Sequence, residues 1–197
     1  MAVIAKDEGK TMELLAEGQY VGRCVWVIDI GTHEGEMFGP KHQVVLGWEL
    51  PEERRQYGDG PEEPVVITKY YTLSLNEKAN LRRDLQQWRG KSFDSEELAG
   101  FDLEKLIGVP CLITITHEAK RNGEKRAAVS GLSKVPGGVT VPPQQTKVKT
   151  FSFGDPALNV LELMPEWLQA KIRSSAEYLE LYPGSDAKKE VSDDIPF

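Results

Sequence analysis

The sequence predicts a mainly β protein of one domain with a helical C-terminal appendage, and three observations lead to that prediction. The chain has 197 residues, of which 40% are apolar and 28% charged, so it can bury a core of its own. Five stretches alternate apolar and polar residues with the two-residue period of a strand. A helical spacing of leucines separates the third stretch from the fourth, and the composition changes after residue 135.

The first three strands are expected at 20–30, 43–50 and 65–73. In the first strand the two-residue period places four apolar side chains on one face: Cys24, Trp26, Ile28 and Ile30. The second strand alternates in the same way through Val44, Leu46, Trp48 and Leu50. Between the second and third strands, residues 51–64 are polar and bounded by proline and glycine, which predicts a long exposed loop.

A helix follows the third strand. Ser74 and Glu77 have the spacing of a capping box, and Leu81, Leu85 and Trp88 then recur at helical intervals. Two more strands are expected at 109–117 and 125–135, joined by the hairpin signal Asn122-Gly123. The resulting order β-β-β-α-β-β is that of a five-stranded OB-fold barrel, a fold that binds oligonucleotides or oligosaccharides.

The remainder of the chain surrounds this predicted barrel. Residues 136–154 have a linker composition, rich in proline, glycine and glutamine, and helical spacing returns further along. The predicted organisation is an N-terminal segment (1–19), the OB-fold domain (20–135), the linker (136–154), a helical extension (155–182) and a flexible acidic tail (183–197).

Charge and cysteine content exclude several classes of protein. Residues 20–150 have equal numbers of basic and acidic groups, whereas residues 151–197 have four basic and nine acidic ones. A neutral body can still present a local basic face, which a uniformly acidic protein could not. No apolar run could span a bilayer, no signal peptide is recognisable, and the two cysteines, Cys24 and Cys111, lie in apolar strands. We therefore expect a protein of the cytoplasm, or of the host cytoplasm if a phage encodes it, without membrane contact.

Residue patterns for catalysis are weak. His33, His42 and His117 lack metal-ligand spacing, and neither a nucleophile elbow nor a phosphate-binding loop is present. We expect no enzymatic activity, no cofactor and no metal.

A nucleic-acid surface is the stronger candidate, because single-strand binders combine a basic groove with aromatic side chains that stack on bases. The predicted hairpin between the last two strands carries four basic residues: Lys120, Arg121, Lys125 and Arg126. Tyr70 lies on the more polar face of the third strand and is the best stacking candidate. Lys69 and Tyr71 are further candidate contacts with nucleic acid, but they have the opposite parity, so either the strand bulges there or Lys69 lies at the barrel rim. Trp26 and Trp48 share faces with aliphatic residues, which favours a core position but leaves stacking open, and the basic track could extend over Arg23 and Lys41.

The last residues form a distinct motif. Asp193 and Asp194 precede Ile195, Pro196 and Phe197, so an aromatic ring lies beside the free carboxylate and two acidic side chains. A basic-rimmed apolar pocket on a partner protein could bind such a peptide.

This ending resembles the acidic C-terminal tip of bacterial single-stranded DNA-binding proteins. The resemblance implies that residues 193–197 recruit replication, recombination or repair enzymes, and that the tip competes with DNA for a basic face. Over residues 20–180 the body is instead similar to a family of phage and prophage proteins identified as OB-fold single-strand binders, through the stretch from Lys69 to Gly90 and residues 101–108. The long 51–64 loop, the helices at 155–182 and the short tail depart from the cellular protein, so the resemblance does not establish its tetrameric assembly here, and a homo-oligomer stays open.

The expected function is to coat and protect single-stranded DNA during phage replication or recombination, and to recruit partner enzymes through the tip. Two alternatives stay open: an adaptor that binds proteins but no DNA, and a metal-dependent nuclease.

Overall fold

A computed structural model describes residues 14–35, 39–120 and 122–184. Within these residues lie six strands, five α-helices and one 3-10 turn in the following order: β1 (Gly18–His33), β2 (Lys41–Gln56), β3 (Glu62–Thr72), α1 (Asn80–Arg89), α2 (Ser95–Ala99), η1 (Leu103–Leu106), β4 (Pro110–Ala119), β5 (Lys125–Ser133), β6 (Lys149–Phe151), α3 (Leu158–Leu161), α4 (Glu166–Arg173) and α5 (Ala176–Leu181).

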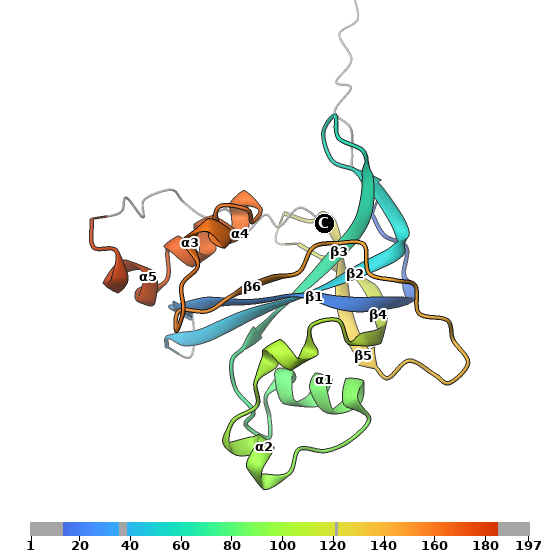
Figure 1. Cartoon of the computed structure of the whole chain (residues 1–197), viewed down its shortest axis with the longest axis horizontal. Helices are drawn as coiled ribbons and strands as arrows, with labels where there is room; N and C mark the ends of the chain where they lie inside the picture. Colours follow the sequence, from blue (N-terminus) through green and yellow to red (C-terminus); the bar gives the residue numbers. More distant parts are fainter. Residues whose placement is uncertain (1–13, 36–38, 121, 185–197) are drawn as a thin grey trace, which may run out of the picture.

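Five of the strands form one curled antiparallel sheet in the order β3-β2-β1-β4-β5 (Figure 1). The expected five strands and the helix after the third are therefore confirmed. The two end strands, β3 and β5, approach each other, and no ladder joins them within the described residues. On the side away from β2, strand β1 pairs with two strands in turn. Its residues 18–23 pair with β4, and its residues 26–28 pair in parallel with β6. The fold is thus mainly β, with a sheet curled into a half-barrel.

Each face of the sheet carries its own apolar core. The inner core combines the concave face of the sheet with α1 and η1, and it includes Cys24, Leu46, Trp48, Ile67, Leu85 and Ile113. The outer core combines the opposite face with the C-terminal extension, and it includes Trp26, Ile28, Val45, Phe151, Leu168 and Ile172. The expected common face for Cys24 and Trp26 is wrong, because an irregularity in the β1–β2 register between these residues shifts the alternation.

Helix α1 closes the inner core. Leu81, Leu85 and Trp88 are buried, as their spacing predicts, and the Trp88 indole N–H donates to the carbonyl of Pro110 at 2.8 Å. The predicted capping box is wrong. The Ser74 hydroxyl accepts from the amide of Asn76 instead, and the helix begins six residues later with no side-chain cap. A capping box does form at α2, where Asp94 and Glu97 satisfy each other's backbone amides.

The expected long loop at 51–64 is also wrong. Strands β2 and β3 continue through most of it, so their connection is only residues 57–61, and the hairpin projects from the barrel (Figure 1). After a register shift between Leu50 and Arg54, residues 54–56 of β2 pair with residues 62–64 of β3, beyond the end of the core.

The stretch expected to be a linker makes specific contacts with the sheet. Glu49 is a fully buried carboxylate on β2, and it accepts hydrogen bonds from the backbone amides of Gln145 and Thr146. Arg23 donates to the carbonyl of Pro142 at 3.2 Å, and the carbonyl of Gly108 accepts a second bond from the same guanidinium at 2.6 Å. These contacts hold the chain along the barrel until it reaches β6.

The helical extension is fastened at its far end by Glu177 of α5. One of its carboxylate oxygens accepts from the Thr32 hydroxyl and the other from the Thr32 amide, both at 2.6 Å. His42 bridges this carboxylate to Asp29, at 3.3 Å from Glu177 and 2.7 Å from Asp29. Helices α3 to α5 consequently lie on the opposite side of the sheet from α1 and α2 (Figure 1).

Both cysteines are buried free thiols in the inner core. Burial raises the pKa of Cys24 to about 12 and that of Cys111 well above its ordinary value, so both remain protonated near neutral pH. In the part of the chain that the structure describes, no helix combines the length and apolar character needed to cross a bilayer.

Candidate nucleic-acid interface

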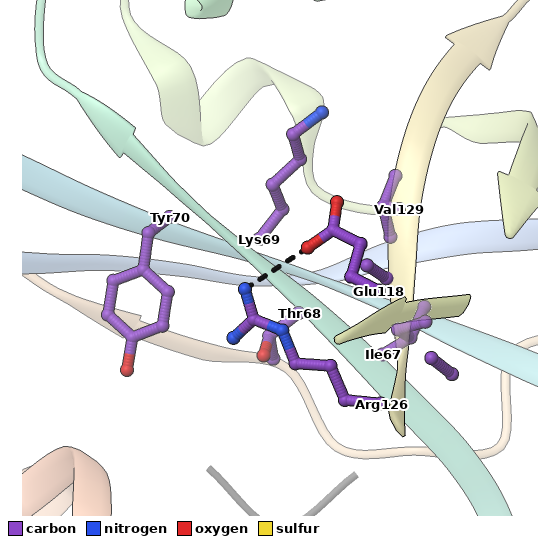
Figure 2. Close-up of a pocket in the computed structure, with 9 residues that line it drawn as sticks. Ile67, Thr68, Lys69, Tyr70, Glu118, Arg126 and Val129 are labelled. Atoms are coloured by element: carbon purple, nitrogen blue, oxygen red, sulfur yellow. Dashed lines mark hydrogen bonds and ion pairs between the residues drawn. The ribbon is translucent and has the colours of Figure 1, made fainter. Parts of the chain in front are cut away.

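A cleft of about 210 Å³ lies where β3 and β5 face each other without pairing. Its walls come from β3 and from both strands of the β4–β5 hairpin: Ile67, Thr68, Lys69, Tyr70, Glu118, Arg126, Ala127, Ala128 and Val129 (Figure 2). Apolar walls, two cations and an aromatic ring therefore meet at a break in the sheet.

The parity of β3 separates the polar side chains of the cleft into two groups. Figure 2 shows Tyr70 and Thr68 on one side of the strand and Lys69 on the other. Tyr70 pairs across the ladder with Val45, and both belong to the outer core, so the Tyr70 ring lies on the outer face of the sheet. This is the less buried face of β3, and Tyr70 on it packs against the apolar outer core.

Tyr70 has an aromatic neighbour from the C-terminal extension. The Trp167 ring of α4 lies with its centroid 6.1 Å from that of Tyr70, and the two planes are inclined by 54°. Both side chains are only partly buried, in contrast to the fully covered Val45 and Leu168 beside them. The two rings thus form an aromatic corner, defined as Tyr70 and Trp167, of which Tyr70 lines the cleft.

Arg126 supplies a cation to the same cleft. Its guanidinium lies 3.2 Å from the carboxylate of Glu118 on the facing strand, and the two side chains are 40% and 50% exposed. Such an exposed ion pair contributes only about 0–1 kcal/mol, so an incoming phosphate could replace the carboxylate at little cost.

The tip of the β4–β5 hairpin continues the basic surface. Lys120 lies 3.5 Å from Glu124, and Lys125 is exposed at the start of β5. Arg121 lies outside the described residues. Of the hairpin cations, Arg126 lines the cleft, whereas Lys120 and Lys125 lie at the two ends of the hairpin turn.

Lys69 points away from the aromatic corner toward α1, where it meets a buried carboxylate. Its ammonium is 2.8 Å from Asp84, which is 1% exposed, and Asp84 also accepts from the Tyr71 hydroxyl at 2.9 Å. Arg83 contributes a third donor at 3.0 Å. The strand does not bulge at Lys69; the lysine is accommodated by this ion pair at the edge of the core.

Two predicted site residues are core residues instead. Trp48 is completely buried and packs edge-on against Trp88, with ring centroids 5.9 Å apart. Tyr71 is 3% exposed, and burial together with the neighbouring charge of Asp84 raises its pKa well above the ordinary value. Neither ring can stack on a base, because the inner core covers both. Trp26 is likewise covered, on the outer side.

Two further predicted cations lie away from the cleft. The guanidinium of Arg23 is committed to the two backbone carbonyls described above. Lys41 begins β2 four residues before Val45, about 13 Å along the strand from the row that contains Tyr70.

The sequence analysis did not single out Trp167 as the neighbour of Tyr70. The structure buries Leu168 completely, whereas Trp167 lies on the flank of α4 and is only partly buried. Adjacent apolar residues at the start of a helix cannot both point inward, which is the signal that placed one of them at the surface.

The remaining predicted features concern metals and partners. Among residues 14–35, 39–120 and 122–184, no three His, Cys, Asp or Glu side chains gather as the ligands of a metal ion would. The predicted partner-binding residues Asp193, Asp194, Ile195, Pro196 and Phe197 lie outside the described residues.

Comparison with protein families and with curated proteins gives no relative from which function could be transferred. No protein-family model matches the chain. No curated protein matches it either.

Proposed function

We propose that this protein binds single-stranded DNA on an OB-type barrel, during phage replication or recombination, and that it catalyses no reaction. The observation that carries the proposal is the cleft between β3 and β5, which Tyr70 of β3 and Arg126 of the basic β4–β5 hairpin both line. In OB-fold proteins the central strands and the loop between the last two strands contact the oligonucleotide.

The strand order supports an OB assignment. Strand β1 pairs with both β2 and β4, and β5 lies opposite β3, which is the arrangement of a five-stranded barrel left partly open. Helix α1, between β3 and β4, packs against the inner core, where an OB-fold places its helix.

The chemistry of the cleft fits a strand with exposed bases. A single strand offers phosphates to the hairpin cations and unpaired bases to Tyr70, and stacking on one aromatic side chain contributes about 1–3 kcal/mol. An oligosaccharide would give the hairpin cations no anionic partner, so nucleic acid is the favoured ligand.

The test is a titration of labelled oligo(dT) of about 15 nucleotides, and of duplex of equal length, at about 50 and 200 mM salt. We expect preferential binding of the single strand. Changing Lys120, Arg121, Lys125 and Arg126 together to Ala should reduce the log–log salt slope by about 0.7 for each phosphate that the variant no longer neutralises.

A matched control removes four exposed lysines from the α1 end of the molecule: Lys78, Lys91, Lys105 and Lys134. This variant loses the same formal charge, so its salt slope should stay close to that of the wild type if the hairpin is the binding surface. Equal slopes in all three proteins, or no binding of the oligonucleotide at all, would refute the proposal.

Recruitment of replication or recombination enzymes by the acidic tip is a second part of the proposal. Deleting residues 193–197 should abolish capture of a partner enzyme from the same replication system, while single-strand affinity stays equal or rises at low salt, where charge screening is weak. Phe197→Ala alone should nearly reproduce the loss of capture. A pull-down in which wild-type and truncated proteins capture the same enzymes would contradict this part.

A further inference from the structure

Lys69 and Arg126, the two cations that line the cleft, are paired with carboxylates in different surroundings. Lys69 is paired with Asp84, which is 1% exposed and belongs to the buried network described above. Arg126 is paired with Glu118, whose side chain is 50% exposed. Separating Lys69 from Asp84 would leave a buried charge without compensation, whereas the Glu118 carboxylate can turn into water at little cost. Of these two cations, Arg126 is therefore the one that can exchange its anionic partner.

The Glu118 carboxylate has a defined position in the cleft. Glu118 and Arg126 lie directly opposite each other in the β4–β5 register, and both line the cleft. Figure 2 shows the carboxylate and the guanidinium directed toward each other. Within the described part of the chain, one hydrogen bond of 3.2 Å joins the two groups, rather than the fork of two bonds that arginine can form with an anion. The ion pair thus uses only part of the binding capacity of the guanidinium.

A phosphodiester group offers Arg126 the same chemistry as the Glu118 carboxylate. Each anion has a single negative charge and accepts hydrogen bonds from guanidinium N–H groups through its oxygens. Exchange of the carboxylate for a phosphate therefore keeps Arg126 paired, and the Glu118 side chain becomes hydrated. Directly opposed residues of an antiparallel ladder have Cβ atoms only about 4.5–5.5 Å apart, so Glu118 stays within reach of the guanidinium after the exchange. Its carboxylate consequently competes at a high effective concentration.

We propose that Glu118 is a built-in competitor for phosphate at Arg126: its carboxylate occupies the place of a DNA phosphate in the free protein and is displaced when a strand binds. This inference rests on the single-strand binding proposed above and adds the regulation of that site. Glu118 is a positioning residue, because it holds the guanidinium in the cleft between binding events. It also weakens the bound complex, which favours release of the strand.

Removal of the competing charge should strengthen DNA binding. Glu118→Gln keeps the length of the side chain and one acceptor oxygen but removes the negative charge. Its affinity for labelled oligo(dT) at about 50 mM salt should rise about 2- to 5-fold, the range that corresponds to the loss of an exposed ion pair. The gain should become smaller at about 200 mM salt, because screening weakens the pair in the wild type. Thermal melts should show that the variant is folded, since Glu118 is half exposed.

Glu124→Gln is the matched control for the change of net charge. Glu124 belongs to the same hairpin, is 67% exposed and lies 3.5 Å from Lys120, outside the set of residues that line the cleft. Both substitutions remove one negative charge, so a general electrostatic effect would change both affinities alike. The decisive measurement repeats both substitutions in an Arg126→Ala background. There the gain from Glu118→Gln should disappear, whereas any effect of Glu124→Gln should remain.

The outcomes separate the two proposals. If labelled oligo(dT) does not bind the wild type, the proposed function itself fails. If it binds, but Glu118→Gln binds no more tightly than the wild type or than Glu124→Gln, competition by Glu118 is refuted while single-strand binding stands. A gain that persists in the Arg126→Ala background would also refute competition, because the charge would then act without the guanidinium. So would an Arg126→Ala variant that binds as tightly as the wild type, because Arg126 would then contact no phosphate.

Discussion

The buried carboxylate of Asp84 provides the sharpest test of how the barrel is held together. Asp84 is 1% exposed and accepts from Lys69 and Tyr71 at 2.8 and 2.9 Å. Replacing it by Asn keeps the shape and one acceptor oxygen but removes the charge that compensates the Lys69 ammonium, whose side chain is only 20% exposed. A hydrogen bond to a charged group contributes about 1.5–3 kcal/mol, so we expect Asp84→Asn to lower the free energy of unfolding by about 2–3 kcal/mol.

In a chain of this size that change corresponds to a decrease in Tm of roughly 5–10 °C. Urea unfolding of wild type, Asp84→Asn, Lys69→Met and the double variant gives the coupling energy, which should exceed about 1 kcal/mol for a direct pair. Asp59→Asn, at an exposed turn, is the control and should change stability by less than about 0.5 kcal/mol. An unchanged Tm for Asp84→Asn, or a coupling energy within about 0.3 kcal/mol of zero, would refute the reasoning.

Three further predictions concern other parts of the structure. Glu49→Gln should destabilise the protein by about 1–3 kcal/mol, because the NH2 group of the new amide cannot accept a hydrogen bond from the backbone N–H groups of Gln145 and Thr146. Hydrogen exchange at Gln145 and Thr146 should then accelerate. Unchanged exchange would contradict the role of Glu49. Burial alone would raise the pKa of Glu177, but the Thr32 hydrogen bonds outweigh it and lower the pKa below 4.5. The stabilising contribution of this carboxylate is therefore complete above that pH and is lost as the pH falls through the folded pKa. In thermal melts, Glu177→Gln should weaken this acid dependence of stability. Gly22→Ala should destabilise the protein by about 1–3 kcal/mol in chemical unfolding, because the alanine Cβ would lie 2.9 Å from the Glu49 carbonyl oxygen and 2.5 Å from the Ile113 side chain. Unchanged stability would mean that β1 can shift to make room.

Local patterns in the sequence predict most of the curled sheet and its helix α1. Alternation locates the five strands, and the leucine spacing locates α1, because both signals arise within a few residues. The face of Trp26 could not be predicted, since an irregularity in strand pairing depends on the partner strand. The extent of the β2–β3 hairpin was missed for the same reason: its outer residues pair with each other and contribute little to the core, so they lack apolar alternation.

The candidate site was predictable where residues are close in sequence and not where they are distant. The hairpin cations follow from the Asn122-Gly123 turn, and the outward position of Tyr70 follows from strand parity. The partnership of Lys69 with Asp84 and that of Tyr70 with Trp167 join different elements, so no local pattern could reveal them. The burial of Tyr71 was missed and stacking stayed open for Trp48, because the sequence does not distinguish an aromatic residue that packs inward from one that stacks on a ligand.

The outer core has a consequence for synthesis of the chain on the ribosome. Its two halves are separated by most of the sequence: Ile28 is made early, whereas Leu168, which covers this face, is made roughly 140 residues later. At ~5–20 residues per second, the apolar outer surface of β1 and β2 is without its cover for roughly 7–28 s. During that interval the nascent barrel exposes Trp26, Ile28 and Val45 to other chains, and the free edge of β1 has no β6 beside it. Chaperones that bind exposed apolar strands therefore have their opportunity in this interval, before the last quarter of the protein has emerged.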